Sequence, residues 1–158
     1  MAVLNWREPI IQICKLDADG KPDKNWRTFP EAVKDTARLN TEPGNETVAE
    51  DEGGGIVDSF RLKSKYVFEV TIFVKKGDEK LIDDVDGVIA ENLAVRWAPK
   101  GSTLKGRQML KTSVSVAETW SSNEGSRLKY SFTGLVPGGE KKILEEYQPA
   151  TTPPPAGG

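Results

Sequence analysis

Residues 65–74 carry the pattern that most constrains how this chain can fold. One set of alternate positions is entirely apolar and consists of Tyr66, Phe68, Val70, Ile72 and Val74, whereas the positions between them hold Val67, Glu69, Thr71 and Phe73. Successive side chains of a β-strand point to opposite sides, so we expect a strand with one apolar and one mixed face. Such a strand suits a sheet that is covered on one side and only partly covered on the other.

The same alternation recurs elsewhere in the chain. Clear strands are predicted over residues 10–16, 110–120 and 128–135, and weaker ones over 36–41, 55–63 and 92–98. The expected inward side chains of the two later strands are Leu110, Thr112, Val114, Val116 and Trp120, followed by Leu128, Tyr130 and Phe132. The polar residues 121–126 between these strands contain Asn and Gly, which is typical of an antiparallel β-hairpin. Trp120 is expected in the core.

Helix signals are scarce. Residues 30–39 are compatible with a helix or with an extended segment, and their alternation favours the extended form. A short helical turn is expected around residues 81–85. The predicted fold class is therefore mostly β, a β-sandwich or barrel with one short helix and extended terminal arms. We expect one domain over residues 1–148, with an N-terminal arm, and a flexible tail rich in Pro and Gly over 149–158.

Composition excludes several kinds of chemistry. The 158 residues contain no histidine and one cysteine, so a Ser-His-Asp relay, a Cys-His pair, a His-based zinc site and an internal disulfide cannot form within the chain. Cys14 lies in an apolar run and is expected to be a small buried hydrophobe. The net charge of −2 argues against tight binding of nucleic acid. We expect no export signal and no membrane span, and therefore synthesis in the cytoplasm.

Two acidic motifs have competing interpretations. Residues 17–23 resemble the start of a calcium loop, but position twelve is Thr28 rather than Glu, and a hairpin turn explains the Asp and Gly equally well. Asp83, Asp84 and Asp86 could serve a carboxylate-based enzyme, yet they are neighbours on one segment that ends at a glycine. Turn chemistry is therefore preferred for both motifs, and no catalytic, cofactor-binding or metal site is predicted.

Residues 40–58 form an acidic segment without any Lys or Arg. It shows no apolar alternation and is broken by three glycines, so we interpret it as a loop hinged at those glycines. The hypothesis is that it reaches a second copy of the chain; the alternative is a solvated surface loop. The residues assigned to this stacking loop are Glu42, Glu46, Glu50, Asp51, Glu52, Gly53, Gly54, Gly55 and Asp58, and the candidate partner cations are Arg61, Lys63, Lys65, Lys75 and Lys76.

The order of segments over residues 35–139 resembles tail-tube proteins of phages that infect Bacteroides-like bacteria. The matching parts, in order, are Glu52-Gly53-Gly54, Val57-Asp58, the long apolar strand, Lys75-Lys76-Gly77, residues 84–88, Ala94-Val95-Arg96-Trp97, Glu118-Thr119-Trp120, Glu124-Gly125, Tyr130-Ser131-Phe132 and Leu135-Val136-Pro137. No single motif is specific, and the resemblance depends on their order. The family's flanking helix has only a weak signal in this sequence.

This resemblance implies a structural protein of the virion tail, the major tail-tube subunit, whose hexameric rings stack around a channel for phage DNA. The fold is related to the inner tube of type VI secretion machines. The implied partners are further copies of the chain, other tail proteins and DNA that passes without tight binding; no cofactor, membrane or enzymatic activity is expected. The alternative function is a carbohydrate- or ligand-binding β-sandwich that uses Trp6, Trp26 and Trp97 as stacking platforms. An enzyme that uses Asp83, Asp84 or Asp86 ranks third.

Overall fold

The computed structural model describes residues 9–30, 32–33, 36–74, 82, 84–99, 105–137 and 142–147. In this part of the chain the strands are β1 (Pro9–Lys15), β2 (Arg27–Thr28), β3 (Arg38–Glu42), β4 (Glu46–Glu50), β5 (Ile56–Arg61), β6 (Lys65–Phe73), β7 (Leu93–Pro99), β8 (Gly106–Ser121), β9 (Gly125–Gly134) and β10 (Glu145–Tyr147). Every pairing between them is antiparallel. The expected mostly β fold class is therefore confirmed.

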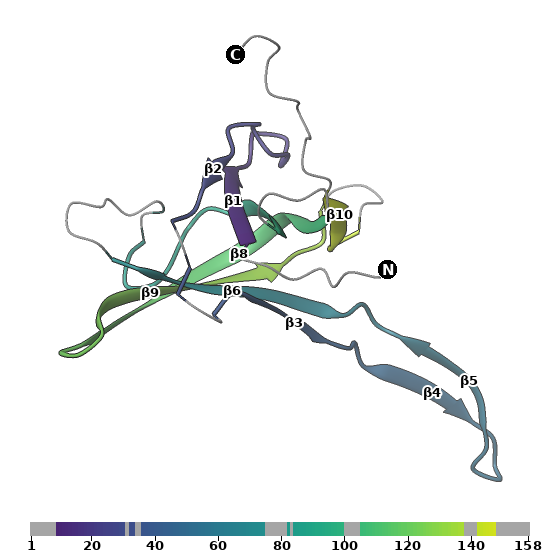
Figure 1. The fold of residues 1–158 in the computed structure, drawn as a ribbon. Helices are drawn as coiled ribbons and strands as arrows, with labels where there is room; N and C mark the ends of the chain where they lie inside the picture. The colour runs from purple at the N-terminus through teal and green to yellow at the C-terminus, as the bar shows by residue number, and fades with distance from the viewer. Residues whose placement is uncertain are drawn as a thin grey trace, which may run out of the picture.

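Eight of the strands form one sheet in the order β2-β1-β7-β8-β9-β6-β3, with β10 attached to β8 (Figure 1). The long strand β8 joins two halves of this sheet, because it pairs with β7 over residues 107–112 and with β9 over residues 112–121. The sheet curls so far that Phe68 on β6 stacks on Trp97 of β7, with ring centroids 4.0 Å apart. It does not close into a barrel, since β2 and β3 remain at opposite ends of the strand order.

The core lies inside this curl. Its fully buried members come from both halves of the sheet, and the largest of them are Tyr130, Phe68, Phe132, Ile13, Leu93, Met109, Val70 and Val95. The predicted apolar face of β6 is confirmed at Phe68, Val70 and Ile72, and that of β9 at all three predicted positions. The hairpin predicted between β8 and β9 is also confirmed, with Ser121 paired to Gly125 across its turn.

A β-bulge shifts the inward face of β8. Leu93 pairs with Thr112 and Val95 with Met109, so between these pairs Ala94 of β7 lies opposite two residues of β8, Leu110 and Lys111. Met109 and Thr112 are both fully buried, whereas Leu110 is only half-buried. The predicted inward position of Leu110 is therefore wrong, because strict alternation does not continue through a bulge.

Two further expectations need correction. No described residue is helical: of the residues around the expected helical turn, Ile82, Asp84 and Val85 are not in a helix, and Leu81 and Asp83 lie outside the described part. Trp120 was expected in the core but is 72% exposed. Trp120 pairs with Ser126, whereas the last β6 residue, Phe73, pairs with Arg127. The hairpin therefore extends beyond β6 at Trp120, where its inward side no longer faces the core.

Candidate assembly surface

Strands β4 and β5 form a separate two-stranded sheet that projects from the body as an arm, defined here as residues 46–61 (Figure 1). The arm continues the direction of β3 and β6 and lies at the opposite end of the molecule from the β8–β9 hairpin. The expectation of an irregular loop is wrong for residues 46–50, which form β4. Thr47 and Val48 are β-branched residues that suit a strand, and β5 supplies the cross-strand hydrogen bonds that their backbone needs.

The three glycines, which were expected to be a hinge, form the turn at the tip of the arm. The backbone N–H of Gly54 donates to the Asp51 carbonyl oxygen at 3.0 Å, and that of Gly55 donates to Asp51 Oδ1 at 2.8 Å. Gly54 has a φ of 85°, in the left-handed region that favours glycine. Asp51 therefore holds the turn closed, while Glu50 and Glu52 are exposed beside it.

The root of the arm is held by Arg61 and Gly44. Arg61 Nη1 donates to the Gly44 carbonyl oxygen at 3.2 Å, and Nη2 donates to Glu46 Oε2 at 3.0 Å. The backbone of Gly44 lies so close to β5 that a Cβ there would be 1.9 Å from the Leu62 carbonyl oxygen. No side chain fits in that space, so the close approach of the two chain segments depends on glycine.

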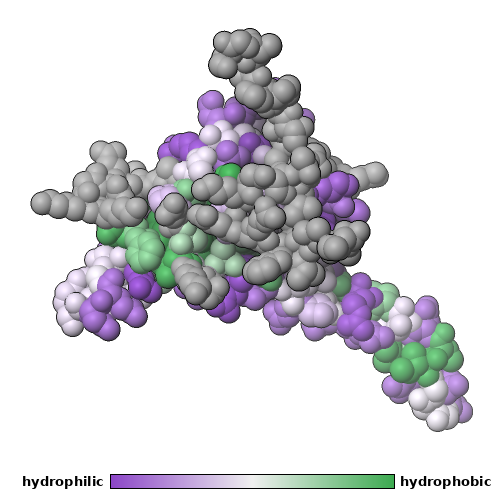
Figure 2. All heavy atoms as spheres, viewed as in Figure 1, coloured by the Kyte–Doolittle hydropathy of each residue, from purple (hydrophilic) through white to green (hydrophobic). Residues whose placement is uncertain are grey.

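Large apolar side chains are exposed along the arm, and Figure 2 shows them as a hydrophobic patch on it. Ile56, Val57 and Phe60 are each at least 60% exposed, Val48 is also accessible, and Leu62 is exposed directly after the arm. Sequence reasoning missed these residues because it treated the segment as charged. The apolar spacing of positions 56, 60 and 62 was the signal that could have identified them.

The predicted acids and cations do not gather into one cluster. Within the described part of the arm, the ion pair is Arg61–Glu46 at the root. Glu42 pairs with Lys65 in the β3–β6 register, outside the arm. Lys63 is exposed in the segment that joins β5 to β6. Asp58 accepts a hydrogen bond from the backbone N–H of Ser59. Lys75 and Lys76 lie outside the described residues.

One face of the sheet β3-β6-β9-β8 has no described strand packed on it. The registers place there the side chains of Arg38, Asn40, Glu42, Lys65, Val67, Glu69, Thr71, Phe73, Ser113, Ser115, Ala117, Thr119, Arg127, Lys129, Ser131 and Thr133. We call this set the open face. Its charged side chains are four bases and two acids, and Lys129 lies 3.8 Å from Glu69. The rest are mostly hydroxyl-bearing, so the open face is polar and its charged side chains give it a formal net charge of +2.

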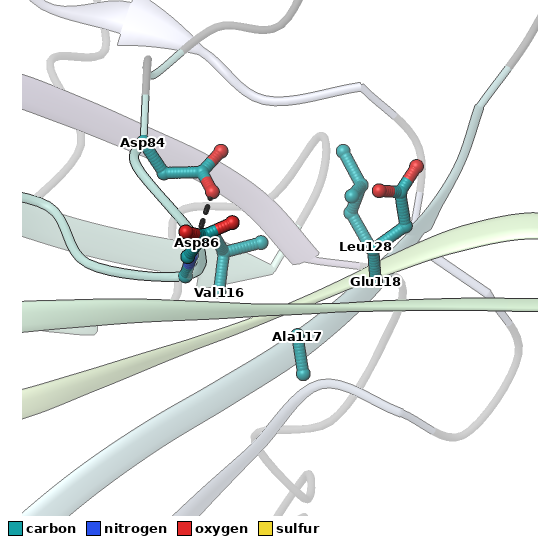
Figure 3. A pocket seen from close by; sticks show the side chains of 7 residues that line it. Asp84, Asp86, Val116, Ala117, Glu118 and Leu128 are labelled. Atoms are coloured by element: carbon teal, nitrogen blue, oxygen red, sulfur yellow. Dashed lines mark hydrogen bonds between the residues drawn. The ribbon is translucent and has the colours of Figure 1, made fainter.

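A pocket of about 510 Å³ lies on the other side of the sheet, at the end occupied by the β8–β9 hairpin (Figure 3). It is lined by Asp84, Asp86, Gly87, Val116, Ala117, Glu118 and Leu128. Asp84 Oδ2 accepts a hydrogen bond from the Gly87 backbone N–H at 2.9 Å, and Asp86 and Gly87 both have positive φ values, of 50° and 85°. Turn chemistry therefore accounts for Asp84, as expected, and Asp83 lies outside the described residues.

The acidic motif of residues 17–23 and the tryptophans Trp26 and Trp97 also have structural roles. Asp17 Oδ1 accepts the backbone N–H groups of Asp19 and Lys21, which closes the turn predicted there. Trp26 lies on Arg96, and Trp97 packs on Phe68 inside the curl. Among the described residues, no group of three or more acidic, His or Cys side chains could hold a metal ion.

Comparison with known proteins identifies no family: no protein-family model matches the chain, and no curated protein matches it in sequence. Among the described residues, no helix is long and apolar enough to cross a membrane.

Proposed function

We propose that this chain is a structural subunit that assembles with further copies of itself into stacked rings, as the major tube protein of a phage tail or a related tail-like machine. The observation that carries the proposal is the arm. A lone two-stranded hairpin is marginally stable in water, and this one leaves large apolar side chains exposed on both strands. Exposed apolar area of this kind is typical of a surface that a partner covers.

The position of the arm supports assembly that continues in one direction. It projects from one end of the sheet, and in the proposed assembly it packs on a different surface of the next copy. Contacts between unlike surfaces build rings or open-ended helical arrays rather than closed dimers. The hexameric state and the passage of DNA are proposed from the resemblance in sequence order.

The open face is the proposed wall of the channel. The long strands β6, β8 and β9 display it, and in a ring they would form a continuous inner sheet. Affinity for a polyanion rises with the number of Lys and Arg groups that replace its counterions. Two of the bases on the open face lie near carboxylates, since Lys129 is 3.8 Å from Glu69 and Arg127 is 3.9 Å from Glu124. These carboxylates would weaken the hold of the face on DNA. No catalytic role is proposed for the pocket acids.

Electron microscopy of the purified protein tests this function. We expect hollow rings or tubes, and strictly monomeric particles at physiological concentration together with affinity for sugars would favour the carbohydrate-binding alternative instead. The arm is tested separately with two variants, Glu50→Ser/Glu52→Ser at the tip, which keeps the turn residue Asp51, and Ile56→Ser/Phe60→Ser on the apolar patch. Both should shorten or abolish tubes while leaving the far-UV circular dichroism intact.

The matched control for the tip variant is Asp19→Ser/Glu91→Ser, which removes exposed acids outside the arm. This control should assemble like the parent protein. If all variants form tubes of parental length, the arm has no stacking role, although tubes would still support the general function. If only the tip variant assembles normally, its acids are a solvated surface and the apolar patch alone makes the contact.

A further inference from the structure

A row of polar side chains crosses the other half of the sheet, on the side that faces away from the core. Register pairs Thr28 on β2 with Gln12 on β1, Gln12 with Arg96 on β7, Arg96 with Gln108 on β8, and Gln108 with Glu145 on β10. Gln12 Nε2 donates to Thr28 Oγ1 at 3.3 Å, and Gln108 Nε2 donates to Glu145 Oε2 at 3.1 Å. The row thus links the N-terminal strand pair to the last described strand.

Arg96 lies at the centre of this row, between two aromatic rings. Its guanidinium carbon is 3.9 Å from the ring centre of Trp26 and 4.6 Å from that of Tyr147, and its Nε donates to Gln12 Oε1 at 2.7 Å. No ion pair with a carboxylate holds it within the described part of the chain. The Arg96 side chain is partly removed from water, and this burial lowers its pKa because desolvation disfavours the charged form. Cation–π contacts strengthen under such desolvation.

The two rings come from distant parts of the chain. Trp26 ends the excursion of residues 17–26 between β1 and β2, whereas Tyr147 ends β10. The excursion contacts the outer side of β1 through Asp23, and Tyr147 lies over Arg96 on the same side of β7. On this side Cys14 and Ala94 are fully buried. Cys14 Sγ donates to Asp23 Oδ1 at 3.0 Å, so the excursion itself is the cover over this thiol.

We propose that Arg96 acts as a latch. Because it stacks on both Tyr147 and Trp26, it couples the packing of strand β10 to the packing of residues 17–26. Removal of the Tyr147 ring loosens Arg96, and a loosened Arg96 no longer holds Trp26 and the cover over Cys14. Strand β10 is suited to such opening because it has only three residues and lies beside one strand. Opening would release both segments together, and the coupling requires no assembly of the chain.

Cys14 reports on this coupling because it is the sole cysteine of the chain and its thiol is covered. The test is the rate at which a thiol reagent modifies Cys14 in the native full-length protein. Tyr147→Ala and Arg96→Met should each raise the rate about three- to tenfold, the range implied by a partly desolvated cation–π contact. Tyr147→Phe keeps the ring and should react at the parental rate.

The control on the same strand is Glu146→Gln, which removes an exposed ion pair with Lys105 and should leave the rate unchanged. Loss of the Arg96 charge would by itself disfavour the thiolate, so an increase in Arg96→Met reports exposure rather than reactivity. In the Arg96→Met background, Tyr147→Ala should add little. If instead the two effects multiply fully, the segments open independently and the latch is wrong.

A second measurement separates local from global opening. Urea titration gives the free energy of unfolding of each variant. A rise in labelling that only matches the fall in this free energy would come from global unfolding and would overturn the proposal, as would a parental rate in Tyr147→Ala. A rise that exceeds it comes from local opening and supports the latch.

Discussion

Thr112 and Tyr130 show how differently two buried polar side chains can be placed. Thr112 is fully buried at the β8 bulge, where its Oγ1 donates to the Leu93 carbonyl oxygen at 2.6 Å. Tyr130 is fully buried in the core, and its hydroxyl has no hydrogen-bond partner among the described residues. Burial and, secondly, the charge of Asp84 raise the pKa of Tyr130 to about 12.

Thr112→Val keeps the branched shape of the side chain but removes its donor. The Leu93 carbonyl oxygen then loses a buried partner, so we expect the free energy of unfolding to fall by about 1–3 kcal/mol. Chemical denaturation measures this change. Thr119→Val lies on the same strand at an exposed position and should change the free energy by less than about 0.5 kcal/mol. Equal effects of the two substitutions would contradict a specific role for the Thr112 hydroxyl.

The raised pKa of Tyr130 predicts that the protein loses stability at high pH. The unfolded state releases the phenol proton near its ordinary pKa of 10.0, whereas the folded state retains it up to about pH 12. Stability from this group is therefore complete below pH 10 and is lost as the pH rises towards 12, by up to about 3 kcal/mol.

Tyr130→Phe should flatten that part of the pH dependence, measured as the free energy of unfolding between pH 9 and about 11.5. At neutral pH the variant should be at least as stable as the parent, because an unpartnered buried hydroxyl contributes no hydrogen bond. An unchanged slope at high pH would show that Tyr130 is not the group responsible.

At the scale of elements, strands with a clear period of two were predictable and strands defined by their partners were not. The segments over β1, β6, β8 and β9 alternate because one face of each packs on the core. Strand β4 carries no such signal, since both its faces are exposed and its conformation depends on hydrogen bonds with β5. The three glycines were expected to be a hinge, and the structure places them in the turn at the tip of the arm. Glycine indicates an unusual backbone conformation but not where in the fold that conformation lies.

The root of the arm gives a test at this scale. Gly44→Ala would place a Cβ against the Leu62 carbonyl oxygen, so the segments at the root must separate. The Leu62 backbone N–H, which donates to the Asn45 carbonyl oxygen at 2.9 Å, should then exchange faster with solvent deuterium. Hydrogen-exchange NMR measures the rate at this amide.

Gly53→Ala at the tip is the control for this substitution, because its Cβ would meet only Asp51 Oδ1 at 3.5 Å. Protection of the Leu62 amide should be unchanged in that variant. If Gly44→Ala also leaves it unchanged, the close approach at the root does not fix the arm.

At the scale of the whole molecule, the curl of the sheet decides what is covered. It brings Phe68 onto Trp97, although two strands separate β6 from β7 in the sheet, and it leaves the open face on the outside. The curl also ends before the tip of the β8–β9 hairpin, which is why Trp120 is exposed despite its apolar position in the pattern. Two ends of the molecule therefore present apolar side chains, one on the arm and one at this hairpin.

The amino-acid sequence by itself determined the β class, the strongest strands and the β8–β9 hairpin. These features follow from local alternation and turn composition, which act over a few neighbouring residues. Only the tertiary structure decided the bulge at residues 109–112, the strand character of residues 46–50, the exposure of Trp120 and the Trp26–Arg96–Tyr147 stack. Strand β4 depends on its pairing with the neighbouring strand β5, and the others depend on how segments distant in the chain are arranged. No local pattern specifies such a partner.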